Sequence, residues 1–216
     1  MKRPGPLLTL LAGLVLGLFL LTLNATTGTK NAASSTVSQS PAPSPKTSAP
    51  PSPTPSPSRT SVPDADYAGR TKDDSAAIAV SLRDGKAIAY FCDGHTKESW
   101  LKGDVEDDGA LRLTGKDGAR LDGTLEEGRR ISGTVDVGGT HQAFTADRAK
   151  KPSGLWRATA TVRSAKIDGG WIILKDGTQV GIVTRDGEPS PAPRIDPETG
   201  AVTVDGQQLT ARPATP

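Results

Sequence analysis

Residues 76–145 read AAIAVSLRDGKAIAYFCDGHTKESWLKGDVEDDGALRLTGKDGARLDGTLEEGRRISGTVDVGGTHQAFT, and this stretch decides the fold. Short apolar runs alternate with glycine-containing pairs such as Asp84-Gly85 and Asp117-Gly118. Asp-Gly between two alternating apolar runs is the strongest short hairpin signal, because both central residues of a type I′ turn need positive φ. The repeated pairs therefore predict a meander of antiparallel strands.

Within these runs, apolar residues recur at every second position. Ile78, Val80 and Leu82 share one face of the first predicted strand. Leu111 and Leu113 share one face of a later strand. A period of two predicts strands with one buried and one solvent-facing side.

The same pattern resumes beyond residue 154. Residues 155–162 are predicted as a strand, and residues 171–184 as a hairpin around Asp176-Gly177. The strands of this hairpin are more uniformly apolar, which predicts burial on both faces. The triplet Asp168-Gly169-Gly170 is predicted as a break between strands, and residues 201–211 as a last hairpin or an edge strand.

Roughly ten short strands cannot form a flat open sheet without curling or closing. We therefore predict an all-β domain over residues 64–187, an antiparallel meander that closes into a small barrel or a two-layer sandwich. Residues 188–216 are predicted as a proline-containing tail with a possible edge hairpin.

The amino-terminal segment, residues 1–25, predicts export. Lys2 and Arg3 precede an uncharged run over residues 7–23. The Lys/Arg flank places the N-terminus inside and the rest of the chain outside. The length of the run suits a single-pass signal-anchor helix in the cell membrane. The alternative is a cleaved signal peptide and a secreted protein, with Leu23-Asn24-Ala25 as a poor cleavage site.

Residues 26–63 are rich in Pro, Ser and Thr and include PAPSPKTSAPPSPTPSPS. Repeated proline fixes φ and removes backbone donors, which opposes both helix and sheet. This segment is therefore predicted as a disordered, extended linker between the membrane segment and the β-domain.

Charge and cysteine content exclude two classes. Five of the 26 basic residues and none of the 24 acidic residues precede Asp64, so the patterned region is slightly acidic. It has no basic stripe, and a nucleic-acid partner is not expected. Because Cys92 is the single cysteine, no disulfide framework is possible, and we expect a buried, unpaired thiol.

Two groups of residues resemble metal sites only in part. Residues 104–109 match the start of a calcium loop, but Gly115 stands where a bidentate glutamate is required, so an acidic turn is the preferred interpretation. Cys92, His95 and His141 have no zinc-motif spacing. No metal and no cofactor are predicted.

Trp100, Trp156 and Trp171 are the candidate ligand-binding residues in a chain that is only 4% aromatic. They could line a barrel mouth and stack on a ligand such as a sugar. The alternative is that they fill the core, as most tryptophans in small β-domains do.

The layout of basic start, apolar segment, Pro/Ser/Thr spacer and Gly/Asp/Thr-rich β-domain resembles exported, membrane-anchored proteins of high-GC Gram-positive bacteria. The phrases that carry this resemblance are AYFCDG, LTGKDGARLDGT, GLWRA and LKDGTQVG. The resemblance covers the whole chain and implies export, but it brings no activity and no site residues.

The predicted function is a non-catalytic β-domain, displayed on the cell envelope, that binds a small ligand, a glycan or a protein partner. One alternative is a hydrolase of cell-wall polymers that uses a carboxylate pair among Asp93, Glu98 and Asp104. Another is a purely structural or sensor protein of the envelope.

Overall fold

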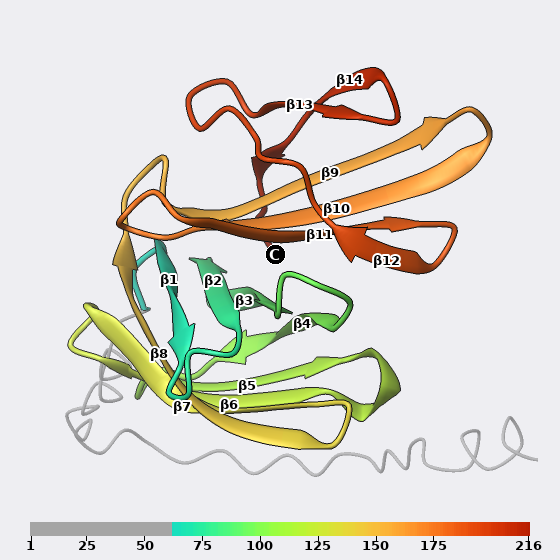
Figure 1. Cartoon of the computed structure of the whole chain (residues 1–216). Helices are drawn as coiled ribbons and strands as arrows, with labels where there is room; N and C mark the ends of the chain where they lie inside the picture. The colour runs from blue at the N-terminus through green and yellow to red at the C-terminus, as the bar shows by residue number, and fades with distance from the viewer. Residues whose placement is uncertain (1–61) are drawn as a thin grey trace, which may run out of the picture. The chain divides into compact units, whose positions relative to one another are not determined.

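The computed structural model describes residues 62–216, which form β-strands joined by short turns (Figure 1). The helical content of this part is one 3₁₀ turn, η1 (Lys116–Gly118). The predicted all-β class is therefore confirmed for these residues. The predicted membrane segment and nearly all of the predicted linker lie outside the described range. Within residues 62–216, no helix has the length and apolar character needed to cross a bilayer.

The first eight strands form a closed antiparallel barrel in sequence order, and β1 closes it by pairing with β8. Asp66 lies opposite Ala149, and Thr71 lies opposite Phe144. The strands are β1 (Ala65–Thr71), β2 (Ala77–Arg83), β3 (Lys86–Cys92), β4 (Glu98–Val105), β5 (Ala110–Gly115), β6 (Arg120–Glu126), β7 (Arg130–Val137) and β8 (Thr140–Ala149). Of the two predicted architectures, this region adopts the barrel.

Apolar side chains fill the interior of the barrel. Tyr67, Phe91 and Phe144 belong to this core and are each at most 2% exposed. The smaller members are Ala65, Ala76, Ile78, Val80, Leu82, Ala87, Ala89, Leu101, Val105, Leu111, Leu113, Ala119, Leu121, Ile131, Val135, Val137 and Ala146. Removal of this surface from water is the main force that holds the barrel closed. The interior is thus a hydrophobic core.

The remaining strands form a five-stranded sheet and a separate hairpin. The order in the sheet is β12-β11-β10-β9-β15, with antiparallel neighbours. Its strands are β9 (Gly154–Val162), β10 (Ala165–Ile173), β11 (Gln179–Arg185), β12 (Glu188–Pro191) and β15 (Arg212–Pro213). The hairpin pairs β13 (Ala201–Val204) with β14 (Gln207–Thr210).

The sheet lies between the barrel and the hairpin (Figure 1). One face packs on the outer surface of β1–β3 through Ala68, Ala77, Ala79, Ile88, Tyr90, Cys92, Leu155, Ile172, Leu174 and Ile182. The other face packs under the hairpin through Trp156, Ala158, Val162, Ile167, Trp171, Ile173, Val183, Val202 and Val204. Residues 188–216, predicted as a tail with a possible edge hairpin, thus contribute both edge strands of the sheet, β12 and β15, and the hairpin that covers one of its faces.

The prediction of one solvent-facing side is wrong for β2 and β3. Ala79, Ile88 and Tyr90 point away from the barrel core, yet each is at most 2% exposed. The reason is that the sheet covers this part of the barrel wall. The prediction of burial on both faces is confirmed for the middle of β10, where Trp171 and Ile172 face opposite clusters and are both fully buried.

The prediction of a break at Asp168-Gly169-Gly170 is also wrong, because these residues lie inside β10. Gly170 is required there by packing. A Cβ on Gly170 would lie 2.5 Å from Cζ of Tyr90 and 2.8 Å from the Trp100 ring, closer than atoms can approach. This glycine therefore brings the barrel and the sheet together. The strand β1, which the sequence pattern did not indicate, precedes the predicted meander and closes it.

Of the three Asp-Gly pairs named in the sequence analysis, two have both residues at positive φ. Asp84 (51°) and Gly85 (73°) form the two-residue turn between β2 and β3, as predicted. Asp117 (53°) and Gly118 (77°) also have positive φ, within η1. At Asp176-Gly177 the type I′ prediction is wrong, because only the glycine has positive φ and its N–H donates to the carbonyl of Leu174.

Candidate functional site

The three candidate tryptophans lie on two sides of the sheet. Trp156 and Trp171 are register neighbours buried under the hairpin, at 6% and 0% exposure. Their indole N–H groups donate to the carbonyls of Pro152 (2.9 Å) and Pro193 (2.8 Å). Trp100 lies on β4, half-buried, and faces the sheet from the barrel side. The structure therefore does not bring the three rings together around one space.

Trp100 packs between groups of the barrel and the sheet. Its ring centroid lies 4.3 Å from that of Tyr90, and the guanidinium carbon of Arg157 lies 4.4 Å from the ring centroid. A cation over an indole face is attracted by the ring quadrupole. Because two protein groups already contact this indole, a ligand that stacks on Trp100 must displace one of them.

Arg157 is held in place by Asp168 on the neighbouring strand β10. Its Nε and Nη2 atoms donate to the two carboxylate oxygens at 2.9 and 2.6 Å. This paired hydrogen bond raises the pKa of Arg157, against the opposing effect of partial burial. A two-point contact of this kind fixes the plane of the guanidinium. The arginine is thus oriented against Trp100 before any ligand arrives.

Glu98 links the barrel to the sheet. The Tyr90 hydroxyl donates to Oε2 of Glu98 at 2.6 Å, and the Thr184 hydroxyl on β11 donates to Oε1 at 2.5 Å. Burial raises the pKa of Tyr90 well above its usual value, and the nearby Cys92 and Glu98 raise it further. Hydrogen bonds to a carboxylate inside a partly dry interface are stronger than neutral ones. Glu98 therefore connects the barrel to the sheet through hydrogen bonds to both.

The other two carboxylates proposed for catalysis are also bound to protein groups. Asp93 accepts backbone N–H bonds from His95, Thr96 and Lys97 at 2.8–3.0 Å, and so shapes the β3–β4 turn. Asp104 pairs with Lys86. It lies six positions from Glu98 on one strand, or about 20 Å at the usual rise per residue. Glu98 and Asp104 therefore do not face each other as an acid–base pair.

The partial metal motifs are occupied by protein contacts. Asp108 accepts the N–H of Ala110 at 3.0 Å in the turn between β4 and β5. Cys92 is buried and unpaired, as predicted, and burial raises the pKa of its thiol to about 12. His95 and His141 are exposed. Among residues 62–216, no group of three or more His, Cys, Asp or Glu side chains could hold a metal ion.

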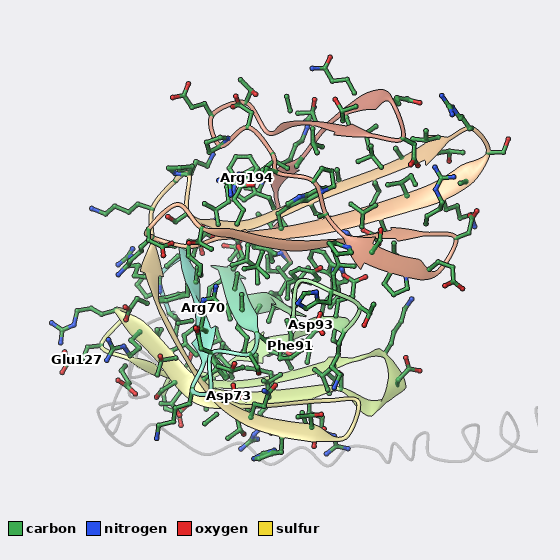
Figure 2. All side chains as sticks on the ribbon, in the orientation of Figure 1. Arg70, Asp73, Phe91, Asp93, Glu127 and Arg194 are labelled. Atoms are coloured by element: carbon green, nitrogen blue, oxygen red, sulfur yellow. The ribbon has the colours of Figure 1, made fainter. Side chains whose placement is uncertain are left out.

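Two surface grooves differ in charge. The larger, about 830 Å³, lies at the β6–β7 turn, where Figure 2 shows Glu127 pointing away from the barrel. Its cations are largely paired with carboxylates: Arg129 with Glu127, and Arg130 and Lys175 with Asp147.

The smaller, about 300 Å³, lies where the barrel meets β9 and β15, and we call it the junction groove. Its lining residues are Ile88, Lys102, Arg157, Thr159, Arg212, Pro213, Ala214 and Thr215.

The junction groove has a cationic lining without acidic residues. Lys102 and Arg212 are exposed, and neither forms an ion pair with any residue in the described part of the chain. Arg157 also lines the groove, but its charge is paired with Asp168. Unpaired cations at a groove attract anionic ligands, and the attraction weakens with salt. The sequence did not indicate this groove, because its residues come from β3, β4, β9 and the C-terminal segment, which only the fold brings together.

No protein-family model, curated protein or solved structure matches this chain.

Proposed function

We propose that this protein is a non-catalytic module of the cell envelope that binds an anionic ligand or partner on its surface, at the junction groove. The observation that carries the proposal is the contrast between a filled barrel and a cationic groove outside it. In ligand-carrying barrels the ligand lies in the interior, which is apolar core here. Binding on the outer surface is the role that this arrangement supports best.

The predicted export supports the same proposal from the sequence. Lys2, Arg3 and the uncharged run over residues 7–23 are typical of a membrane anchor, and residues 26–63 of a spacer. A β-domain on such a spacer would present the junction groove to polymers and proteins of the envelope. The hydrolase alternative has weaker support, because Glu98 and Asp104 are engaged in separate contacts.

Sedimentation with isolated cell envelopes tests the proposal. The full-length protein in detergent is mixed with envelopes, and both the pellet and the soluble sugars released are measured. We expect the protein to pellet without release of sugars, and to pellet less as salt rises. Release of soluble fragments would support the hydrolase alternative, and a protein that stays in the supernatant at low salt would contradict envelope binding.

A pair of matched variants locates the binding. Lys102→Glu with Arg212→Glu reverses the charge of the junction groove, and we expect it to abolish most of the pelleting. Arg120→Glu makes the same kind of change on β6, which lies across the barrel from the sheet. Arg120 is exposed and forms no ion pair in the described residues. Equal losses in both variants would mean that the junction groove is not the site.

A further inference from the structure

One edge of β9 is only partly covered. Val162 and Ala165 flank a two-residue turn at Arg163 (φ 49°) and Ser164 (φ 71°), which makes them a hydrogen-bonded pair. Since pairing alternates along an antiparallel ladder, Val162 and every second residue before it bond to β10. Thr159 and Thr161 therefore direct their backbone N–H and C=O groups away from β10.

The strand β15 covers only the first part of this edge. Arg212 and Pro213 pair with Arg157 and Trp156, and the N–H of Ala214 donates to Leu155. From residue 158 onward, no strand of the described chain pairs with this side of β9. The hairpin β13–β14 covers a face of the sheet and forms its own two-stranded ladder.

The open edge presents polar, accessible residues. Thr159 and Thr161 are exposed, and Thr159 lines the junction groove. An unpaired edge is a template for another strand, which natural proteins usually block with proline or a bulge. The opposite edge of the same sheet has that protection, because Pro189 and Pro191 lie in β12. The edge of β9 between residues 158 and 162 has no proline.

Cations surround this open edge on the barrel side. Arg212 is the register partner of Arg157, so both side chains lie on the face that lines the junction groove, with Lys102 across from them. Arg163 in the turn is exposed, and like Lys102 and Arg212 it forms no ion pair in the described residues. An added strand would therefore gain most from acidic side chains at every second position.

We propose that the edge of β9 binds an extended acidic segment of a partner protein as an added β-strand. Its backbone would pair with Thr159 and Thr161, and its acidic side chains would lie in the junction groove beside Lys102 and Arg212. This inference rests on the proposed binding function and specifies the chemical class of the partner, an extended acidic peptide segment. Strand addition of this kind takes its affinity from backbone hydrogen bonds and its specificity from alternate side chains.

Three other occupants fit less well. A second copy would place the same unpaired cations against each other, and like charges on paired strands are unfavourable. Residues 1–61 of this chain contain five basic residues and no acidic one, so they lack charge complementarity. An anionic glycan would satisfy the cations but has no repeating amide groups to pair with Thr159 and Thr161.

The test uses the full-length protein in detergent and short synthetic peptides in which valine or threonine alternates with glutamate. Binding is measured by fluorescence anisotropy. The control peptide has the same sequence with N-methyl groups on the amides that would donate to β9, which keeps the charge and removes the hydrogen bonds. We expect a loss of at least about tenfold in affinity on methylation, because several backbone bonds are lost together. Equal affinity for both peptides would overturn the proposal.

Variants of the protein test the same backbone pairing without a change in the peptide. Thr161→Pro removes one outward N–H at a position where an edge strand tolerates proline, and we expect about tenfold weaker binding. Thr161→Val keeps the backbone donor and should bind within about twofold of the unmodified protein. Arg120→Glu should also remain within about twofold, because a charge across the barrel is screened. Equal losses for Thr161→Pro and Thr161→Val would overturn backbone pairing.

The failure of this inference and the failure of the proposed function give different results. Binding of polygalacturonate but not of the acidic peptide would replace the peptide with a glycan and leave surface binding intact. Dimers that Thr161→Pro abolishes would identify a second copy as the occupant. If neither probe binds but envelopes still retain the protein through Lys102 and Arg212, only the strand addition is wrong. If envelopes do not retain it either, both proposals fail.

Discussion

The outer surface of the barrel is covered by the sheet over β1–β3, whereas it faces solvent at β6. On β2, both faces are buried, since Ala79 points outward under the sheet and is 0% exposed. On β6, Leu121 fills the core while Arg120 and Thr124 are exposed to solvent. Alternation therefore identifies the inner face of a strand, whereas the burial of the outer face depends on whether another layer packs against it.

The largest effect is expected from a charge placed on the covered side. Ala79→Asp would bury a carboxylate without a partner between β2 and the sheet, and should lower the free energy of unfolding by about 4 kcal/mol. Thr124→Asp on the exposed side of β6 should cost less than about 1 kcal/mol. Urea denaturation of both variants measures the difference. Similar costs would mean that the sheet does not cover β2 in solution.

The next effect concerns the contact that joins the two layers. Gly170→Ala would place a methyl group within 2.5–2.8 Å of Tyr90 and Trp100, and should lower the free energy of unfolding by about 3 kcal/mol. Gly187→Ala is a useful control. An added Cβ there meets no atom within 4 Å, although its φ of 94° still strains the backbone. A smaller loss of unfolding free energy for Gly170→Ala than for Gly187→Ala would argue against close packing of Gly170 on Tyr90 and Trp100.

The interface should also be sensitive to alkali. Burial raises the pKa of Cys92 from 9.0 to about 12, so between these values the unfolded chain releases a proton that the folded chain keeps. The contribution of this thiol to the free energy of unfolding is therefore fully present below about pH 9. It falls as pH rises, by up to about 1.4 kcal/mol per pH unit. Cys92→Ala should show a shallower decline in its denaturation midpoint between pH 9 and 11. Parallel profiles would show that the thiol is accessible.

The smallest effect is expected at a turn. Arg163 and Ser164 both have positive φ without a glycine, which costs conformational energy. Ser164→Gly should raise the free energy of unfolding by about 1 kcal/mol, because glycine adopts this region freely. Thermal unfolding would show the change. A loss of stability would indicate that the serine side chain contributes more than its backbone strain.

Much of the meander was predictable, because each hairpin carries its own local signal. The two-residue turns at Asp84-Gly85 and Asp186-Gly187 lie between paired strands, at breaks that the sequence marks. The turn at Arg163-Ser164 was missed because neither residue type prefers positive φ. Asp168-Gly169-Gly170 resembled a turn because the reason for Gly170, its contact with Tyr90, is remote in sequence.

The candidate site was less predictable than the fold. The three tryptophans were identifiable by type, but no local pattern gives their burial. Trp156 and Trp171 are buried by the hairpin β13–β14, and Trp100 is partly buried by the sheet that packs on the barrel. The junction groove joins Lys102 on β4 to Arg212 near the C-terminus, residues far apart in the chain. The pairing of β15 with β9 and the packing of the sheet on the barrel together make them neighbours.

The pairing of β1 with β8 has a consequence for the time course of folding. Each of the other barrel pairs joins neighbours in sequence and can form as a local hairpin, whereas β1 must wait until β2 to β7 have been made and β8 has emerged. Closing so long a loop carries an entropic cost, and non-local pairing is slow. During synthesis, β1 would therefore spend an interval as an open edge. Refolding should accordingly show early hairpin signals and a late step in which Tyr67 becomes buried.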